Sequence, residues 1–242
     1  MKNTIIIMGS SYRCGSTLVQ RILNSIPNVL ILGEENIVLP SVGRSIKYAC
    51  HRDVESKKQR DLFIENPNCW QANLGMERET TVRASGAYYY QWFKDMSEKV
   101  GYDEAPKTVG FKSLFATTDT LMGAVNIFEN PYILFLHRNF QDSFTSYSKC
   151  KWRSYSLSDF ANRWESSMHL LDNSFDSAIN DRVAYEDIKT LDWLRKIQEK
   201  LDLQIDWPKA TSILKDKIRH PPNEQDKEIQ ECNKRILENL CP

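Results

Sequence analysis

Short apolar segments alternate with amphipathic segments along the chain. Each apolar segment is a nearly continuous run of Ile, Val, Leu and aromatic residues, which is typical of strands that helices cover on both faces. The expected strands are 4–8, 29–32, 108–112, 132–137 and 182–185. Apolar residues spaced three and four apart predict helices at 16–25, 140–151, 157–171, 191–201 and 229–240. This alternation predicts an α/β fold, with a central parallel sheet of about five strands flanked by helices.

Residues 41–107 interrupt the alternation. They are polar, poor in strand-like segments, and carry several aromatic residues, among them Trp70, Trp92 and the tyrosines at 88–90. We expect a mainly helical insertion between the second and third strands. Inserts in open α/β folds lie above the carboxyl ends of the strands, where ligands bind, so the insertion is expected to be an acceptor-binding region. The same aromatic side chains would also suit a helical cap that binds nothing.

The composition changes this picture little, but it excludes several classes of function. With 41% hydrophobic and 26% charged residues, residues 1–242 are expected to form one globular domain. Since 32 basic residues balance 32 acidic ones, binding to nucleic acid or to an anionic membrane surface is not expected. No apolar run approaches the ~20 residues of a membrane helix. The six cysteines form no CxxC pair and the four histidines show no metal-ligand spacing, which favours a cytoplasmic protein with reduced thiols and no metal.

A loop of mostly small residues, 9–17 (GSSYRCGST), joins the first predicted strand to the first predicted helix. A strand, a tight loop and a helix N-terminus direct several backbone N–H groups at one point, which favours a phosphate. The loop resembles a P-loop, but that motif ends in Gly-Lys-Ser/Thr, whereas here Ser16 follows Gly15 and the cation is Arg13. ATP hydrolysis is therefore not expected. A tight turn that binds nothing would fit the same residues.

A second candidate anion site follows the fourth predicted strand. Arg138 lies at the exit of that strand, and Ser146 lies about two turns along the helix that is expected to begin near Asn139. Taken alone, such an arginine also suits an ordinary salt bridge.

Together the two segments resemble the nucleotide-binding signatures of sulfotransferases. The first resembles the loop for the 5′-phosphosulfate of 3′-phosphoadenosine 5′-phosphosulfate (PAPS), and Arg138 with Ser146 resembles the site for its 3′-phosphate. Further segments are similar to the tyrosylprotein sulfotransferase branch: Gly33-Glu34-Glu35, Gly110-Phe111-Lys112 at a strand end, and Ala184-Tyr185-Glu186-Asp187. The resemblance covers roughly residues 4–40 and 108–203.

The resemblance implies which residues bind the donor. A sulfuryl group would pass in line from PAPS to a hydroxyl or amine, leaving 3′-phosphoadenosine 5′-phosphate. The implied nucleotide-binding residues are Arg13, Cys14, Gly15, Ser16, Thr17, Arg138, Ser146 and Tyr185. Arg13 and Lys112 would also act in catalysis by stabilising charge on the sulfuryl group and the leaving oxygen, so no metal is required. Tyr185 would lie near the adenine, or else be a buried strand tyrosine.

Two adjacent carboxylates are candidates for the general base. The resemblance favours Glu35, at the carboxyl end of a strand and facing the loop. Glu34 is then expected to be solvated or to cap a helix. Glu34 remains the alternative base, because a shift of one residue along a strand exchanges the directions of the two side chains.

Departures from the tyrosylprotein branch concern the acceptor. Ile37 and Ser41 stand where that branch has two arginines, and Cys150 stands where it has a third basic contact to the 3′-phosphate. Peptide tyrosine is therefore not the expected acceptor, and the acceptor, a small molecule or another peptide, stays unidentified, as does the oligomeric state. Two alternative functions remain: a P-loop kinase for a small molecule, and a non-catalytic nucleotide-binding protein.

Overall fold

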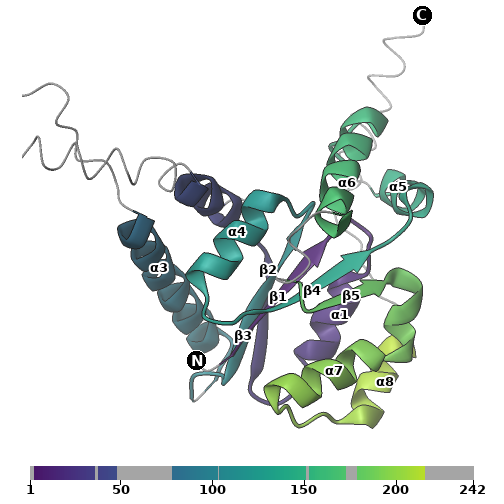
Figure 1. Cartoon of the computed structure of the whole chain (residues 1–242). Coiled ribbons are helices and arrows are strands. Elements are labelled where there is room, and N and C mark those ends of the chain that lie inside the picture. Colours follow the sequence, from purple (N-terminus) through teal and green to yellow (C-terminus); the bar gives the residue numbers. More distant parts are fainter. Residues whose placement is uncertain are drawn as a thin grey trace, which may run out of the picture.

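Five parallel strands form one sheet in the order β2-β3-β1-β4-β5 (Figure 1). This computed structural model describes residues 3–35, 38–47, 78–102, 104–150, 153–172 and 179–215. The strands are β1 Asn3–Gly9, β2 Val29–Glu34, β3 Thr108–Leu114, β4 Tyr132–His137 and β5 Asp181–Ala184. The helices are α1 Ser16–Leu23, residues 38–47, α3 Arg78–Lys99, α4 Thr118–Ile127, α5 Phe140–Ser148, α6 Leu157–Asp172, η2 Tyr185–Thr190, α7 Asp192–Leu201 and α8 Trp207–Lys215.

The predicted α/β fold and its five strands are confirmed, with small changes at the ends. The expected fifth strand ran to Tyr185, but β5 ends at Ala184 and Tyr185 begins the 3-10 helix η2. The helical periodicity did not predict α4 or α8. The expected helix at 229–240 and Trp70 both lie outside the described residues.

Helices cover both faces of the sheet, which explains why the strands are apolar throughout. Along β1, Ile5 and Ile7 belong to one buried cluster, and Ile6 and Met8 to another. The first cluster lies under α1, α7 and α8, and the second lies under α3 and α4 (Figure 1). Strands buried on both faces need hydrophobic side chains at every position.

The described part of the insertion forms part of the second helical layer. On α3, the buried Tyr89 stacks on Phe111 of β3 with ring centroids 5.6 Å apart, and Phe93 packs beside it. The expectation that the insertion lies above the strand ends is therefore wrong for α3, which lies along the sheet face. Its central aromatic residues stabilise the core, because rings of this size each bury a large apolar area.

Helix 38–47 crosses α4 at close range. A Cβ at Gly43 would meet the backbone of Asp119, and a Cβ at Gly123 would meet the backbone of Leu39. The two glycines therefore allow the helix backbones to approach more closely than larger residues would. This contact fixes helix 38–47 directly after the end of β2.

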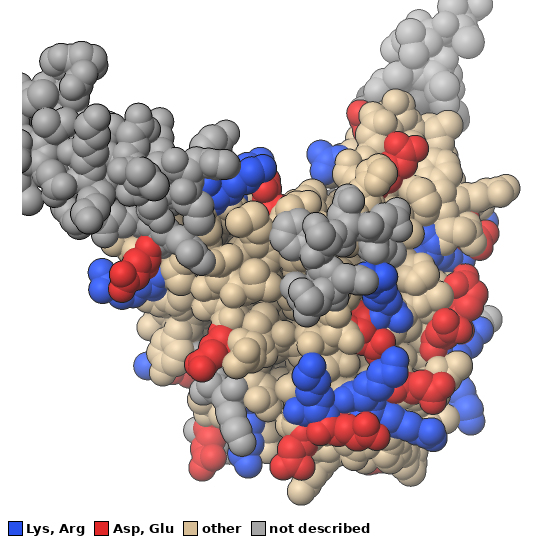
Figure 2. Space-filling model, viewed as in Figure 1, with Lys and Arg blue, Asp and Glu red and all other residues tan. Residues whose placement is uncertain are grey.

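Charges are mixed on the surface. Figure 2 shows basic and acidic residues interspersed over the region of α7 and α8 on this face, with no large patch of one sign. The distribution agrees with the equal numbers of basic and acidic residues in the sequence.

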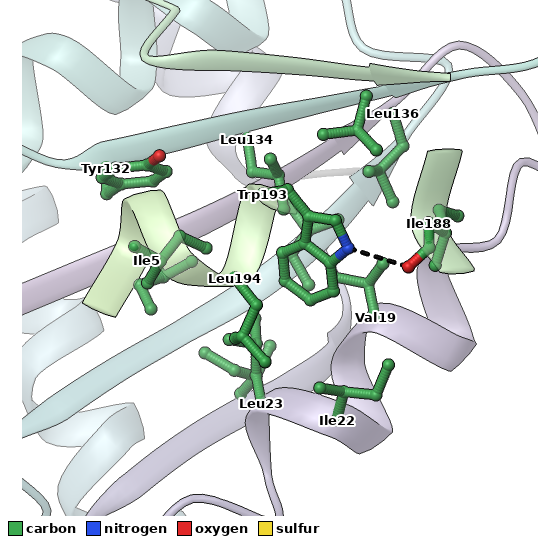
Figure 3. Close-up of a cluster of buried hydrophobic side chains, with 14 of the residues drawn as sticks. Ile5, Val19, Ile22, Leu23, Tyr132, Leu134, Leu136, Ile188, Trp193 and Leu194 are labelled. Atoms are coloured by element: carbon green, nitrogen blue, oxygen red, sulfur yellow. Dashed lines mark hydrogen bonds between the residues drawn. The ribbon is translucent and has the colours of Figure 1, made fainter. Parts of the chain in front are cut away.

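Trp193 on α7 anchors the first cluster. Figure 3 shows its indole among side chains of β1, β4 and α1, with Nε1 donating a hydrogen bond to the carbonyl of Ile188 at 3.1 Å. Trp193→Ala is expected to lower the free energy of unfolding by about 3–5 kcal/mol, because it leaves a large cavity and an unpaired carbonyl. Urea denaturation measures this loss. Tyr88→Ala, at a half-exposed position on α3, is the control and should change the stability little; equal losses would contradict the prediction.

Candidate active site

The loop between β1 and α1 has a backbone that few residues can adopt. Arg13 and Gly15 both have left-handed conformations, with φ of 69° and 93°. A Cβ at Gly15 would also collide with the side chains of Ile188 and Tyr185. Only glycine fits there, and the turn aims the first N–H groups of α1 into the space above the sheet, where no intrahelical carbonyl can accept from them.

One cavity lies at the carboxyl ends of the strands and brings together most of the predicted nucleotide-binding residues. It is lined by Tyr12, Arg13, Gly15, Ser16, Thr17, Leu18, Glu34, Leu114, Arg138, Ser146 and Tyr185. Seven of these were implied by the resemblance, and they come from the loop, α1, α5, η2 and the exit of β4. Parallel strands end at the same edge of a sheet, so segments distant in sequence meet here.

The two arginines of the separate signatures reach one another. Arg13 Nε donates a hydrogen bond to Ser146 Oγ at 3.0 Å, and Arg138 Nη1 donates one to the carbonyl of Arg13 at 3.2 Å. Arg138 also stacks on the Tyr185 ring, 4.0 Å from its centroid. Both cations therefore face one cavity, which is the arrangement that a ligand with two separate anionic groups requires.

A hydrogen bond fixes the backbone of Arg138, whereas one nitrogen of its guanidinium has no hydrogen-bond partner among the described residues. Trp164 Nε1 on α6 donates a hydrogen bond to the Arg138 carbonyl at 3.0 Å. Arg138 Nε is buried and has no hydrogen-bond partner in the part of the chain that the structure describes. A buried donor of this kind is costly unless a ligand satisfies it, so the group suits an incoming anion.

Lys112 lies beneath the cavity at the end of β3. Its side chain is buried, and Nζ donates a hydrogen bond to Thr17 Oγ1 at 3.1 Å. The same nitrogen lies 3.5 Å from Glu34 Oε1. Lys112 therefore connects the end of the loop between β1 and α1 to the carboxylate on β2.

A β-bulge in β2 decides the directions of the two glutamates. Ile31 pairs with Gly110, and two residues later on β3 Lys112 pairs with Glu34 instead of Gly33, so β2 contains one extra residue. Residues at the same register point to the same face, and the bulge therefore turns Glu34 toward Lys112 and the cavity.

The expected directions of Glu34 and Glu35 are reversed in the structure. The side chain of Glu34 is 38% exposed and lines the cavity. Glu35 is 7% exposed and accepts hydrogen bonds from the N–H groups of Val38 and Leu39, at 2.6 and 2.9 Å. Glu35, not Glu34, is therefore the carboxylate at the start of helix 38–47, where a negative charge also suits the helix dipole.

Two further residues of the loop are Cys14, whose expected contact with a phosphate is through its backbone N–H, and Tyr12. Cys14 is fully buried in the first cluster, burial raises the pKa of its thiol, and its side chain does not line the cavity. Tyr12 does line the cavity, although no sequence argument assigned it a role. The available signal was its size, because an aromatic residue stands among small ones in a loop suited to phosphate.

The described residues contain no group suited to a metal ion and no membrane-spanning helix. No group of three His, Cys, Asp or Glu side chains there could hold a metal ion. His137 is half-buried, and burial lowers its pKa despite the nearby carboxylates of Glu186 and Asp187. Cys14 and Cys150 are free thiols, and no described helix has the length and apolar character needed to span a membrane.

Comparison with known proteins shows the family of this chain. A sequence profile of the sulfotransferase family matches residues 5–208 of the 242-residue chain. No curated protein is significantly similar in sequence. One similar solved structure is the "Sulfotransferase Domain from the Curacin Biosynthetic Pathway", with 15% identity, a TM-score of 0.48, and coverage of 96% of this chain and 98% of that chain. Because the profile spans the sheet and both arginine segments, the chain belongs to the sulfotransferase family.

Proposed function

We propose that the protein transfers a sulfuryl group from PAPS to a hydroxyl or amine of a small-molecule or peptide acceptor. The observation that carries the proposal is the meeting of Arg13 and Arg138 in one cavity, although they follow different strands. PAPS differs from ATP in carrying a 3′-phosphate, which requires a second cation away from the first. Arg138 supplies that cation.

The residues of the cavity fit such a donor. Its 5′-phosphate would be held by the N-terminus of α1 with the hydroxyls of Ser16 and Thr17, and its 3′-phosphate by Arg138 and Ser146. The Tyr185 ring, which Arg138 stacks on, lines the cavity and would lie near the adenine. The unpartnered Arg138 Nε supports this assignment, since a phosphate oxygen would satisfy it.

In the proposed reaction, two cations stabilise negative charge and one carboxylate accepts a proton. When bound, PAPS supplies the sulfuryl group: the acceptor oxygen or nitrogen bonds to sulfur, and 3′-phosphoadenosine 5′-phosphate leaves with the electron pair of the broken S–O bond. Arg13 and Lys112 stabilise the negative charge on the sulfuryl and leaving oxygens. Glu34 accepts the proton of the acceptor. Glu34 is favoured as the base because it lines the cavity. Both carboxylate oxygens of Glu35, in contrast, accept hydrogen bonds from backbone N–H groups.

Two alternatives fit less well. A P-loop kinase would need a lysine after Gly15 to reach the outer phosphates, and Ser16 stands there. A non-catalytic nucleotide-binding protein would not need a buried lysine paired with a cavity-lining carboxylate, and Lys112 with Glu34 forms that pair.

The test compares nucleotides by the thermal stabilisation they produce. We expect 3′-phosphoadenosine 5′-phosphate without metal to raise the melting temperature more than ADP, or ATP with Mg²⁺, at equal concentration, because only the first carries a 3′-phosphate. Arg138→Ala should weaken its binding about 10-fold or more while changing ADP binding little, since a charge-assisted hydrogen bond is lost.

The matched control is Arg195→Ala. Arg195 also stacks on an aromatic ring, that of Trp207, but it does not line the cavity. This variant should bind every nucleotide as the native protein does. Stabilisation by ATP with Mg²⁺ alone would overturn the proposal in favour of a kinase.

A further inference from the structure

The ring of Tyr185 has partners in the protein before any nucleotide binds. The guanidinium carbon of Arg138 lies over one face of the ring, 4.0 Å from its centroid. A Cβ at Gly15 would lie 3.1 Å from Cδ2 and 3.4 Å from Cε2 of the same ring, so this edge packs close to the loop between β1 and α1. A purine therefore cannot stack on the face that Arg138 covers.

The side chain of Arg138 is bonded at both ends, but its plane is not fixed by these bonds. Its carbonyl accepts a hydrogen bond from Trp164 Nε1 at 3.0 Å, and its Nη1 donates one to the carbonyl of Arg13 at 3.2 Å. A single hydrogen bond at the tip lets a guanidinium tilt about it. Stacking on an aromatic face removes this freedom, because the flat cation then has one favourable orientation.

One edge of the Arg138 guanidinium remains available. Nε and Nη2 lie side by side along this edge, and their N–H groups match two oxygens of a phosphate. Nε is buried, and neither nitrogen makes a hydrogen bond within the part of the chain that the structure describes. Because the Tyr185 ring contacts only the face of the guanidinium, it orients both donors without competing with an anion for them.

We infer that Tyr185 is a positioning residue, whose ring holds the Arg138 guanidinium so that Nε and Nη2 face the 3′-phosphate of the nucleotide. The identity of that anion rests on the proposed function, whereas the stacking contact does not. The ring can also lie beside the adenine, but its contribution to affinity then passes through Arg138. Only nucleotides with a 3′-phosphate should depend on it, whereas a ring that stacked on adenine would serve every adenine nucleotide alike.

The first experiment measures by calorimetry how Tyr185→Leu and Tyr185→Phe bind two nucleotides. One is 3′-phosphoadenosine 5′-phosphate, and the other is adenosine 5′-monophosphate, which lacks only the 3′-phosphate. Tyr185→Leu removes the ring and should weaken binding of the first about 3–30-fold, the range of a cation–π contact, with binding of the second unchanged. Tyr185→Phe keeps the ring and should bind both as the native protein does.

The second experiment is a double-mutant cycle on the affinity for 3′-phosphoadenosine 5′-phosphate. In the Arg138→Ala background, Tyr185→Leu should cause no further loss, because the ring has no guanidinium left to orient. The matched control is Trp207→Leu, which removes the ring beneath Arg195. Trp207 packs against the same core cluster as Tyr185 but does not line the cavity, so this variant should bind both nucleotides normally.

The outcomes separate this inference from the proposed function. Equal losses for the two nucleotides in Tyr185→Leu would overturn the inference and assign the ring to the adenine. Additive losses in the cycle with Arg138→Ala would overturn it too, as would an unchanged affinity of Tyr185→Leu for 3′-phosphoadenosine 5′-phosphate. A native protein that bound this nucleotide no better than adenosine 5′-monophosphate would instead overturn the proposed donor, and the inference with it.

Discussion

Glu34→Gln is expected to lower sulfuryl transfer by about 10²–10⁴-fold, the usual contribution of a positioned general base. Glutamine keeps the shape of the side chain in the cavity but cannot accept the proton of the acceptor. The affinity for 3′-phosphoadenosine 5′-phosphate should remain close to that of the native protein, because the groups proposed to bind the phosphates are on the loop, at the exit of β4 and on α5. Turnover is measured with the acceptor that gains a sulfuryl mass in a mass-spectrometric screen, and nucleotide binding by calorimetry.

Glu35→Gln is the matched control for this prediction. Glu35 holds the backbone N–H groups of Val38 and Leu39, and glutamine can accept with only one of its two terminal atoms. We expect a loss of about 0.5–2 kcal/mol in unfolding free energy, as for a weakened helix cap, with most of the turnover retained. The opposite result, in which Glu35→Gln abolishes turnover and Glu34→Gln does not, would contradict the assignment of Glu34 as the general base.

Lys112→Met should produce the second large effect, a loss of about 10²–10³-fold in turnover. Methionine fills most of the buried space of the lysine stem but carries no charge. The ammonium group donates a hydrogen bond to Thr17 Oγ1 and pairs with Glu34, so in the proposed reaction it is the cation between the donor-binding loop and the base. Its removal takes away charge stabilisation at the leaving oxygen. Single-turnover kinetics at saturating PAPS measures this loss apart from binding.

Lys196→Met, on α7, is the control for a lost lysine charge away from the cavity. Lys196 Nζ lies 2.9 Å from Asp181 Oδ1 at the start of β5, and neither residue lines the cavity. The variant should keep its turnover. If Lys112→Met retained native turnover as well, Lys112 would have no role in charge stabilisation.

The general arrangement of the elements could be predicted from residue patterns alone. Ile5 to Met8 are apolar at every position because each side of β1 is covered, and that continuity identified a buried parallel strand. The helix α4 was not predicted, because Leu121 is the one large apolar residue among its buried residues, the others being Thr120, Gly123 and Ala124, and small or polar residues produce little periodic signal. Gly15 illustrates a position that sequence reasoning identified and the structure explains by its left-handed backbone.

Candidate site residues followed from spacing and family resemblance, but their contacts did not. Arg13 and Arg138 are 125 residues apart, and only the order of the strands brings the loop after β1 next to the exit of β4. The aromatic run at 88–90 was a candidate for ligand binding, yet Tyr89 packs against Phe111 in the core. Composition identifies an aromatic-rich segment, whereas packing decides which of its rings are buried.

The amino-acid sequence by itself determined the α/β architecture, the tight loop between β1 and α1 and the pair of adjacent carboxylates at the end of β2. Tertiary structure decided which carboxylate enters the cavity. Regular alternation along β2 would place Gly33 opposite Lys112 and turn Glu35 to the cavity side. The extra residue in the strand places Glu34 opposite Lys112 instead, and Glu35 then turns to the N-terminus of helix 38–47. A bulge depends on pairing with the neighbouring strand, and for that reason the local sequence alone cannot specify it.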